Sequence, residues 1–447
     1  MKNNISKQFQ KAADKIRSFP KDTRIRVISH YDTDGITAAA IICKALLNAG
    51  YDFHVTLMRN PFDKGLERVS KEENKVIIFS DMGSGQIETI EKMKSEIIII
   101  DHHQFIKEKT RDNVLQINAN LCGINGNYEA CGASLSYSFA KALDKKNIEL
   151  APLAITGMIG DKQYIGGIRG YNKNIVDEAK ENNLVSENIK IKLYGNTLFD
   201  ALYYSIDPYY SKISGNKEGI LKIFEKLKLK EDIKIDELDL EQKKKLQSIL
   251  LLTLIKKGCE KNILDTIIRP RYKSKIFDCE LERLSDLIDS CGKGKARGVA
   301  LSILLGDKES FEEGKKIEKN FKDEVLDELL RLEKDGFKDK KSYRYFYTKD
   351  SSLGGVIGGI ANNYLIDKEK PLISIVRKND EIHVSCRGNQ YLVKKGLDLG
   401  DAMKKASIKL NGHGGGHAIA AGATIDSKNE DEFLKIIDDI LSKQMGI

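Results

Sequence analysis

The 447-residue sequence carries 74 Lys and Arg against 66 Asp and Glu, a formal net charge of +8, and its hydrophobic fraction is 41%. This length predicts two or three domains, and the modest positive charge permits nucleic-acid binding without demonstrating it. No apolar run is long enough to span a bilayer, so no membrane partner is expected. The seven cysteines form no CxxC pair, which argues against a disulfide scaffold or a thiolate zinc site and predicts reduced thiols in the cytoplasm.

The first hundred residues alternate between strand-like and helix-like segments. Residues 1–20 have a polar, helical pattern unlike that of a signal peptide. Strands are predicted at 25–29, near 54–58, at 76–80 and at 97–100, with helices between them at 35–50, 64–75 and 86–95. The last strand is four isoleucines, and such a run suits a strand covered on both faces. The alternation predicts an α/β fold with a doubly wound parallel sheet.

Carboxylate and imidazole groups follow these apolar segments. In chain order they are His30, Asp32, Asp34, Asp81, Asp101, His102 and His103, with Asp161 after a further apolar stretch at 155–160. Polar groups at the carboxyl ends of parallel strands meet at one edge of the sheet, where α/β proteins hold their ligands. One such Asp is usually a turn or cap residue, but four segments together predict a metal centre.

The spacing of these groups predicts two neighbouring ions. Asp32 and Asp34 are two residues apart in a turn, so they can diverge to two ions that a single Asp from another strand bridges. Mixed imidazole and carboxylate ligation favours manganese, cobalt, iron or zinc. Two ions about 3.5–4 Å apart clamp a phosphate and lower the pKa of a bridging water. The predicted chemistry is hydrolysis of a phosphoester or phosphoanhydride.

Residues 114–151 contain a candidate anion site. Residues 118–120 read NAN, and residues 131–143 read CGASLSYSFAKAL, in which Gly-Ala-Ser opens a predicted helix. The backbone N–H groups at such a helix N-terminus can bind an anion. An ordinary capped helix explains the same residues equally well, so both interpretations stay open.

From about residue 215 the composition shifts to Lys, Glu, Leu and Ile in helical spacing. This predicts a mostly helical connector whose charge runs solvate helix faces, with a further charged helix at 310–335. Within it, DSCGKGKARG at 289–298 is a basic glycine-rich loop between helices. Either it is a plain surface turn, or Lys293, Lys295 or Arg297 contacts a phosphate.

The sequence after residue 341 predicts a separate small α/β domain. Strand-like segments at 342–350 and 371–388, with a turn at 378–381, precede an amphipathic helix at 429–444. Residues 354–361, GGVIGGIA, read as a glycine-rich loop that enters a helix. Ser385 and Arg387 suit phosphate binding.

Residues 412–417, GHGGGH, form the second candidate constellation. We expect a glycine-rich loop in which Gly414, Gly415 and Gly416 offer N–H groups as an anion nest. His413 and His417 flank the glycines and can donate to a phosphate oxygen. A flexible turn is the alternative interpretation, and the two flanking histidines favour the anion site.

Together these motifs resemble the DHH phosphoesterase superfamily. The resemblance rests on HYDTDG at 30–35, SDMG at 80–83, DHH at 101–103, GDK at 160–162, and GHGGGHAIAAGA at 412–423, which is typical of the companion DHHA1 domain. Within the superfamily the chain is most similar to archaeal RecJ-like single-strand exonucleases. We expect a DHH catalytic domain at 1–214, the helical connector at 215–340 and a DHHA1 domain at 341–447.

The resemblance implies two sets of ligands for manganese, with magnesium or cobalt as alternatives. One ion would be held by His30, Asp32 and Asp81, and the other by Asp34, Asp81, His102 and Asp161. His103 would contact the scissile phosphate, and Asp101 would orient an imidazole or touch a metal-bound water.

The resemblance also implies a set of substrate contacts. Backbone phosphates would be bound by Ser385, Arg387, the glycines at 414–416 and His417. Lys293 stands where the family usually has Arg, and a Lys is a point charge that cannot bind a phosphate in a bidentate fork.

Three functions agree with these residues. The first is a processive exonuclease on single-stranded DNA or RNA, and the second is a phosphodiesterase for short oligonucleotides or cyclic dinucleotides. The third is an accessory nuclease that works with replication or helicase proteins. The large connector argues against the second, since a dinucleotide needs no long channel. The complete set of ligand types argues against an inactive relative.

Overall fold

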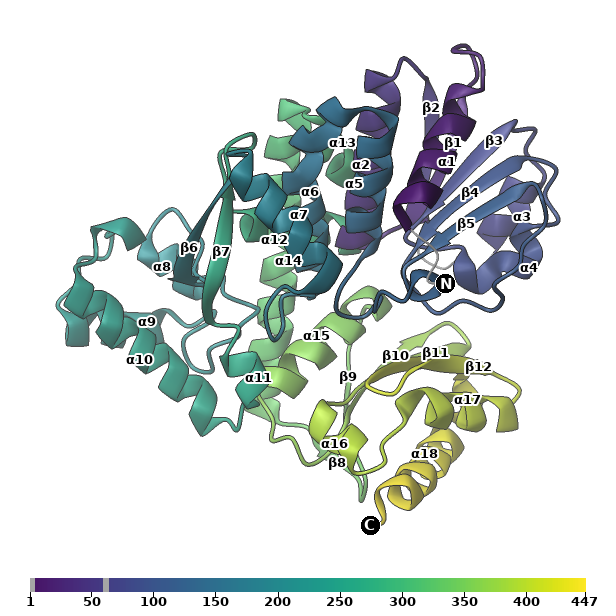
Figure 1. Ribbon diagram of the computed structural model, residues 1–447. Helices are drawn as coiled ribbons and strands as arrows, with labels where there is room; N and C mark the ends of the chain where they lie inside the picture. The colour runs from purple at the N-terminus through teal and green to yellow at the C-terminus, as the bar shows by residue number, and fades with distance from the viewer. Residues whose placement is uncertain (1–4, 59–63) are drawn as a thin grey trace. The chain divides into compact units, whose positions relative to one another are not determined.

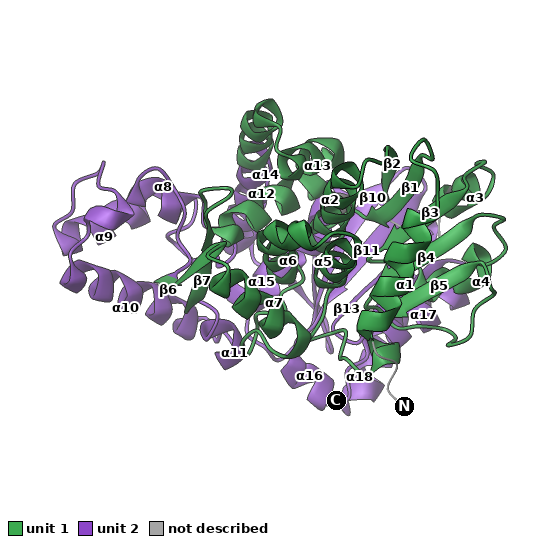
Figure 2. Ribbon diagram, turned by 45° about the horizontal axis from the view of Figure 1, so that its top comes forward, with its two compact units in different colours: residues 1–190, 269–319 green, residues 191–268, 320–447 purple. Residues whose placement is uncertain are grey.

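A computed structural model describes residues 5–58 and 64–447 (Figure 1). The chain forms two compact units, and each is built from two stretches of sequence (Figure 2). The first unit comprises residues up to 190 together with residues 269–319. The second unit comprises residues 191–268 together with residues 320–447. The domain boundaries at 214 and 340 stay predictions. Among the described residues, no helix has both the length and the hydropathy needed to cross a membrane.

The first unit contains the predicted parallel sheet. Its strands are β1 (Ile25–His30), β2 (Phe53–Met58), β3 (Val76–Ser80), β4 (Glu96–Asp101) and β5 (Val114–Asn118). They lie in the order β2-β1-β3-β4-β5, and all four pairings are parallel. The order reverses between β1 and β3, and α/β proteins bind ligands beyond the carboxyl ends of the strands at such a switch point.

Both faces of this sheet are covered, as the isoleucine run indicates. Ile97 and Ile99 belong to a core with α3 (Lys64–Ser70) and α4 (Ile87–Ile90). Ile98 and Ile100 face the opposite way, into a larger core whose helices include α1 (Ile5–Arg17), α2 (Thr33–Asn48), α5 (Gly132–Leu143) and α6 (Ala151–Gly160). Each buried isoleucine contributes about 1.5–3 kcal/mol to folding, so the run anchors β4 firmly.

The first four residues of the predicted N-terminal helix lie outside the described residues. Three other predicted elements of this unit differ from the structure. The helix α3 ends at Ser70, and the helix predicted at 86–95 is reduced to the short η1 (Ser84–Gln86) and α4. The apolar stretch before Asp161 is the helix α6 and not part of the sheet. A continuous apolar run has no period that separates a buried strand from a buried helix, and Pro152 in the first turn favours the helix.

The remaining elements of the first unit come from both of its stretches. They are η2 (Asn120–Cys122), η3 (Lys145–Leu150), α7 (Gly170–Glu181), β6 (Val185–Ile191), β7 (Ile268–Ser274), α12 (Leu281–Lys293), α13 (Arg297–Leu305) and the start of α14 (Lys308–Asp335). Strands β6 and β7 pair in a small sheet. Helices α12 and α13 pack on α6 and α2, so part of the predicted connector belongs to the first core.

The second unit is helical in its first stretch, as predicted. Its helices are α8 (Leu198–Tyr203), α9 (Lys217–Leu227), η4 (Ile235–Glu237), α10 (Leu240–Lys256) and α11 (Lys261–Leu264). They share a core with α15 (Ser351–Tyr364) and the later part of α14.

The second stretch of this unit carries a mixed sheet. Its strands are β8 (Lys338–Asp339), β9 (Arg344–Tyr347), β10 (Leu372–Lys378), β11 (Glu381–Arg387), β12 (His413–His417) and β13 (Ala420–Asp426), in the order β12-β13-β11-β10-β9-β8. Helices α17 (Leu399–Lys409) and α18 (Glu430–Met445) cover one face. The elements α16 (Gln390–Lys394) and η5 (Ser427–Asn429) complete the unit.

Both glycine-rich segments predicted as loops are regular elements. Residues 413–417 form β12, paired along β13, and residues 354–361 lie inside α15. In β12 the glycines permit close packing of α17, because a Cβ at Gly414 would lie 2.6 Å from the Met403 carbonyl oxygen. The composition suggested flexibility, but Gly414 in β12 and Gly354 and Gly355 in α15 lie where another element passes too closely for a side chain.

Candidate metal centre

The turn after β1 brings the first ligand candidates together. Asp32 is the N-cap of α2, and its Oδ1 accepts a hydrogen bond from the Gly35 backbone N–H at 3.0 Å. Its Oδ2 lies 2.9 Å from His30 Nδ1. A Cβ on Gly35 would lie 2.6 Å from both the Cβ and the carbonyl oxygen of His30, so the glycine in HYDTDG lets the end of β1 pack against the start of α2.

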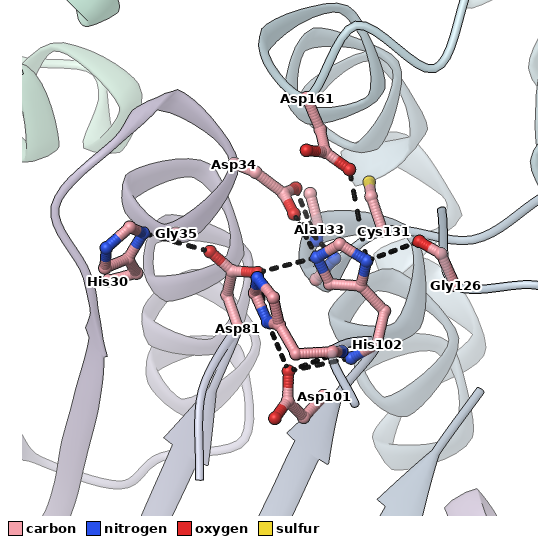
Figure 3. Close-up of polar contacts among 12 residues, drawn as sticks. His30, Asp34, Gly35, Asp81, Asp101, His102, Gly126, Cys131, Ala133 and Asp161 are labelled. Atoms are coloured by element: carbon pink, nitrogen blue, oxygen red, sulfur yellow. Dashed lines mark hydrogen bonds and ion pairs between the residues drawn. The ribbon is translucent and has the colours of Figure 1, made fainter. Parts of the chain in front are cut away.

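Asp34 reaches across to the N-terminus of α5 (Figure 3). Its Oδ2 accepts from the Gly132 N–H at 2.7 Å, and its Oδ1 accepts from the Ala133 N–H at 2.9 Å. The predicted anion site at this helix start is therefore filled by a carboxylate of the chain itself. The arrangement links the β1 turn to α5, which follows in the chain about a hundred residues later.

Asp81 lies between the two groups of ligand candidates. Its Oδ2 is 3.8 Å from His30 Nδ1, while its Oδ1 is 3.1 Å from His102 Nε2. The residue has a φ of +55°, a region that costs a non-glycine residue energy. A Cβ on Gly132 would lie 2.5 Å from Asp81 Cβ, so this carboxylate is packed directly on the α5 backbone.

The residues at the end of β4 and directly after it divide into two roles. Asp101 Oδ1 accepts from His103 Nδ1 at 2.8 Å and from the backbone N–H groups of His102 and His103, while its Oδ2 accepts from the Ser84 N–H at 3.0 Å. All these bonds bind the carboxylate into the loop, so Asp101 orients His103. His102 Nδ1 instead donates to the Gly126 carbonyl oxygen at 2.6 Å (Figure 3).

Potential ligand atoms gather in three overlapping groups, each with its atoms within 4.8 Å of one another. Their members are His30, Asp32 and Asp81; Asp34, His102 and Asp161; and Asp81, His102 and His103. The first group is identical to the ligand set predicted for one ion. The second group contains three of the four ligands predicted for the other ion. The fourth, Asp81, lies next to this group because its Oδ1 is 3.1 Å from His102 Nε2. The structure thus brings all six predicted ligands together, although Asp161 arrives from the end of α6.

The electrostatics of the centre favour a cation. Burial raises the pKa of Asp81 well above its usual range, and the charges of Asp34 and Asp32 raise it further. Burial is also the main cause that raises the pKa of Asp161, to about 7; His102 opposes this rise, while the charges of Asp34 and Asp32 add to it. Carboxylates crowded in this way repel one another, and divalent cations relieve that repulsion. The imidazoles and carboxylates present fit manganese or a similar ion.

The His103–Asp101 pair has the opposite character. Burial would lower the pKa of His103, but Asp101 raises it to about 9. Burial would raise the pKa of Asp101, yet His103 and the surrounding donors hold it below its usual range. The pair is thus an imidazolium beside a carboxylate, and His103 keeps its Nε2 for another partner. Its side chain is 47% exposed, which lets a substrate reach it.

Lys293 lies in the first unit, beside the β1 turn. Its Nζ pairs with Asp289 Oδ2 at 2.5 Å, and Asp289 Oδ1 accepts from Thr33 Oγ1 at 3.5 Å. A Cβ on Gly292 would lie 2.7 Å from the Tyr31 carbonyl oxygen, so the end of α12 packs tightly on this turn. The segment is therefore not a plain surface turn, and it supports the loop that carries Asp32.

The other predicted substrate contacts lie in the second unit. Residues directly opposite on antiparallel strands share a face, and the register joins three rows across β12, β13 and β11. The rows are His417–Ala420–Arg387, Gly415–Gly422–Ser385 and His413–Thr424–His383. Gly414 and Gly416 lie on the opposite face, toward α17. Five of the seven predicted residues thus share one face.

Helix α15 supports Arg387 on this face. A Cβ on Gly355 would lie 2.8 Å from Arg387 Nη2, whereas one on Gly358 would lie 3.7 Å from its Cγ. The guanidinium therefore runs along a helix surface that glycines leave open. His383 and Thr424 share the face with Arg387 and were not predicted, although the alternation in EIHVSCR places His383 in line with Ser385.

Sequence reasoning also missed the polar residues around the metal centre. Asn118 Nδ2 donates to Ser84 Oγ at 2.8 Å and to the His103 carbonyl at 2.9 Å. Asn120 and Gln163 hold neighbouring backbone in the same way. The NAN segment was noted in the sequence, but the sequence does not indicate which backbone carbonyl an Asn side chain will bind.

Comparisons with known proteins agree with this architecture. The family model for the DHH N-terminal domain matches residues 24–158, the DHHA1 domain matches 341–443, and the archaeal Cdc45 model matches 138–285. An uncharacterized protein of Methanocaldococcus jannaschii is 35% identical over 434 residues, which cover 94% of each chain. The chain belongs to the DHH phosphoesterase superfamily and is a DHH-family hydrolase.

Two further relatives match at greater distance. YorK of Bacillus subtilis, a putative prophage-derived single-strand DNA-specific exonuclease, is 28% identical over 150 residues, 32% of this chain and 25% of YorK. The structure of RecJ in complex with Mn²⁺ from Thermus thermophilus superposes with a TM-score of 0.61 at 17% identity. That match covers 98% of this chain but only 55% of RecJ, so the likeness establishes the fold.

Proposed function

We propose that the protein is a metal-dependent exonuclease specific for single strands, which hydrolyses phosphodiester bonds of DNA, RNA or both. The observation that carries the proposal is the position of Asp81, whose two oxygens lie 3.8 Å from His30 and 3.1 Å from His102. One carboxylate that faces two ligand groups suits a bridge between two ions.

Two ions, most simply manganese, would polarise the phosphate and activate a water when bound. We assign one to His30, Asp32 and Asp81, and the other to Asp34, Asp81, His102 and Asp161. The α5 N–H groups keep Asp34 turned into the centre, and the Gly126 carbonyl keeps the His102 ring in place.

His103 and Asp101 are the chain's own catalytic pair in this proposal. His103 carries a proton at neutral pH, since its pKa is raised to about 9. With Nδ1 held by Asp101, its Nε2–H can donate to a non-bridging oxygen of the scissile phosphate. Such a donor stabilises the charge that develops on the phosphate in the transition state.

The sheet face of the second unit is the proposed backbone-binding surface. Arg387 can form a bidentate contact with a phosphate, and Ser385 and His417 offer further donors on the same face, where Gly415 leaves the sheet surface without a side chain. Contacts of this kind recognise the backbone and not the bases, which suits a nuclease without sequence preference. The similarity to YorK, a putative single-strand DNA-specific exonuclease, supports a single-strand substrate by analogy.

The test is manganese-dependent digestion of long single strands of DNA and RNA labelled at either end, with Asp81→Asn as the inactive control. The proposal expects stepwise shortening from one end by the wild type only, and the labelled end reports the polarity. A dinucleotide is digested in parallel. Cleavage of the dinucleotide alone would contradict the exonuclease and favour a small-substrate phosphodiesterase.

The archaeal Cdc45 match over residues 138–285 favours one second role. The protein would then act with replication or helicase proteins in the cytoplasm, in addition to cleaving strands. Tight strand binding without any cleavage by the wild type would contradict the exonuclease and would leave an accessory role based on binding as the better account.

A further inference from the structure

Asn120 and Gln163 lie beside the metal centre but belong to none of its ligand groups. Both are amides, and both bond to Gly126, whose carbonyl oxygen is the acceptor for His102. Gln163 is only 2% exposed, and its partner Asn172 is fully buried. Two polar side chains that converge on one residue next to candidate ligands call for a physical explanation.

The Gly126 carbonyl determines which nitrogen of His102 carries the proton. This oxygen accepts from His102 Nδ1 at 2.6 Å and from Gln163 Nε2 at 2.9 Å. Because a carbonyl can only accept, Nδ1 must hold a hydrogen. The lone pair of the neutral ring is then on Nε2, which lies 3.1 Å from Asp81 Oδ1 and 3.6 Å from Asp34 Oδ2. This is the tautomer that can bind an ion among those carboxylates.

Asn120 fixes Gly126 against the histidine backbone. Its Oδ1 accepts from the Gly126 N–H at 3.1 Å, and its Nδ2 donates to the carbonyls of His102 at 2.9 Å and His103 at 3.1 Å. A Cβ on Gly126 would lie 1.9 Å from the His102 carbonyl oxygen. The two backbones are therefore in direct contact, and one amide joins them from both sides.

Gln163 couples the same carbonyl to Asp161. Its Nε2 also lies 2.8 Å from Asp161 Oδ2 and 2.9 Å from the Ala130 carbonyl oxygen, so its two hydrogens are shared among three acceptors. Its Oε1 accepts from Asn172 Nδ2 at 2.5 Å. Every group around Nε2 is an acceptor, so the orientation of the amide follows from its partners. One side chain thus holds both His102, through Gly126, and the Asp161 carboxylate.

We propose that Asn120 and Gln163 are positioning residues that preset the tautomer and direction of His102 and the rotamer of Asp161 for metal binding. The inference rests on the proposed metal-dependent function, but it concerns residues that touch neither ion nor substrate. Outer partners of this kind typically change metal affinity 10–100-fold when they are removed.

The experiment compares Gln163→Met and Asn120→Ala with the wild type in the full-length chain. Mn²⁺ affinity is measured by calorimetry, and the ¹⁵N shifts of the His102 ring are measured without metal at a pH that leaves the imidazole neutral. We expect about 10–100-fold weaker Mn²⁺ binding and loss of the pure Nδ1–H tautomer. Asn127→Ala is the matched control, since Asn127 is exposed in the same loop and should change neither quantity.

Asn120→Asp keeps the inference testable where the other variants fold poorly. It retains an acceptor for the Gly126 N–H but loses the donor to the His102 and His103 carbonyls, so we expect an intermediate loss of affinity. Folded Asn120→Asp or Gln163→Met protein with wild-type Mn²⁺ affinity and an unchanged tautomer would overturn the inference. Wild-type protein that binds no Mn²⁺ would instead refute the proposed metal centre, while a tautomer that still depended on Gln163 would uphold the positioning.

Discussion

Asp81 and Asp161 lie close to other carboxylates, and this proximity lowers the folding stability of the metal-free protein when both residues are ionised. Burial and the neighbouring Asp34 and Asp32 raise the pKa of both residues, so each holds its proton to a higher pH in the folded chain than in the unfolded one. A group with a raised folded pKa contributes stability below its unfolded pKa and loses it as the pH rises through the folded value. His103 behaves in the same way, with a pKa raised from 6.5 to about 9.

This crowding predicts a pH dependence for the metal-free protein. For Asp161 the affected window runs from its ordinary 3.8 to about 7, and for His103 from 6.5 to about 9. Asp32 and Asp101 have lowered pKa values, so their contribution to folding stability is lost only as the pH falls below the ordinary pKa of an Asp, outside both windows. In EDTA, the Tm should therefore fall as the pH rises from about 5 to 9, and Mn²⁺ should raise it most at the alkaline end.

Thermal denaturation in EDTA and in Mn²⁺ across this range checks the prediction. Asp161→Asn should flatten the acid half of the profile, and His103→Gln the alkaline half. An identical profile in the wild type and both variants would contradict the assigned pKa shifts.

At the scale of single elements, glycines decide how closely the helices approach the site. A Cβ on Gly157 in α6 would lie 2.2 Å from Ala133 Cβ and 2.8 Å from Asp34 Oδ1. Gly157→Ala should therefore destabilise the protein by about 1–3 kcal/mol through overpacking and weaken Mn²⁺ binding. Gly298→Ala in α13, where nothing lies within 4 Å of the added Cβ, should instead stabilise it slightly. Urea unfolding of both variants tests the contrast, and equal effects would refute it.

Helix α15 offers a matched pair for the substrate face. Gly355→Ala would place a Cβ 2.8 Å from Arg387 Nη2 and should displace the guanidinium, while Gly358→Ala makes an ordinary 3.7 Å contact with Arg387 Cγ. In a single-strand binding titration, Gly355→Ala should lose affinity toward the level of Arg387→Ala, and Gly358→Ala should keep it. Similar affinities for the two glycine variants would argue against the helix as a support for Arg387.

The glycines also show where prediction from the sequence reaches its limit. The strands after which the ligands lie were predictable, because runs such as that of β4 match buried strands and the motifs follow them directly. The strand at residues 413–417 and the helix that contains residues 354–361 were not predictable. A glycine can indicate that another element passes close to the backbone, but the sequence does not show which element that is. Asp161 was predicted as a ligand, but the periodicity of its apolar run could not identify α6 as a helix.

At the scale of the whole molecule, the chain leaves its first unit at residue 190 and returns at residue 269. The returning α12 and α13 pack on α6 and α2 and support the turn that carries Asp32. Composition could not reveal this return, because α12 has the same charged, amphipathic pattern as the connector helices before it. The amides that hold the DHH loop were unpredictable for a related reason: their partners are backbone carbonyls distant in sequence.

The return predicts which segments unfold together. In native-state hydrogen exchange, amides of α12 should open with those of β1, β3 and β4, and amides of α10 should follow the second unit. Exchange of α12 together with α10 would contradict the assignment of residues 269–319 to the first unit.

The central claim is that four segments of this chain build one centre for two divalent ions. It is tested most directly by the number of Mn²⁺ ions bound per chain at equilibrium, measured by dialysis and metal analysis of the wild type and of Asp81→Asn. The account predicts two ions for the wild type and at most one, weakly held, for the variant, because Asp81 faces both ligand groups. A single ion in both proteins, or two ions in the variant, would contradict it.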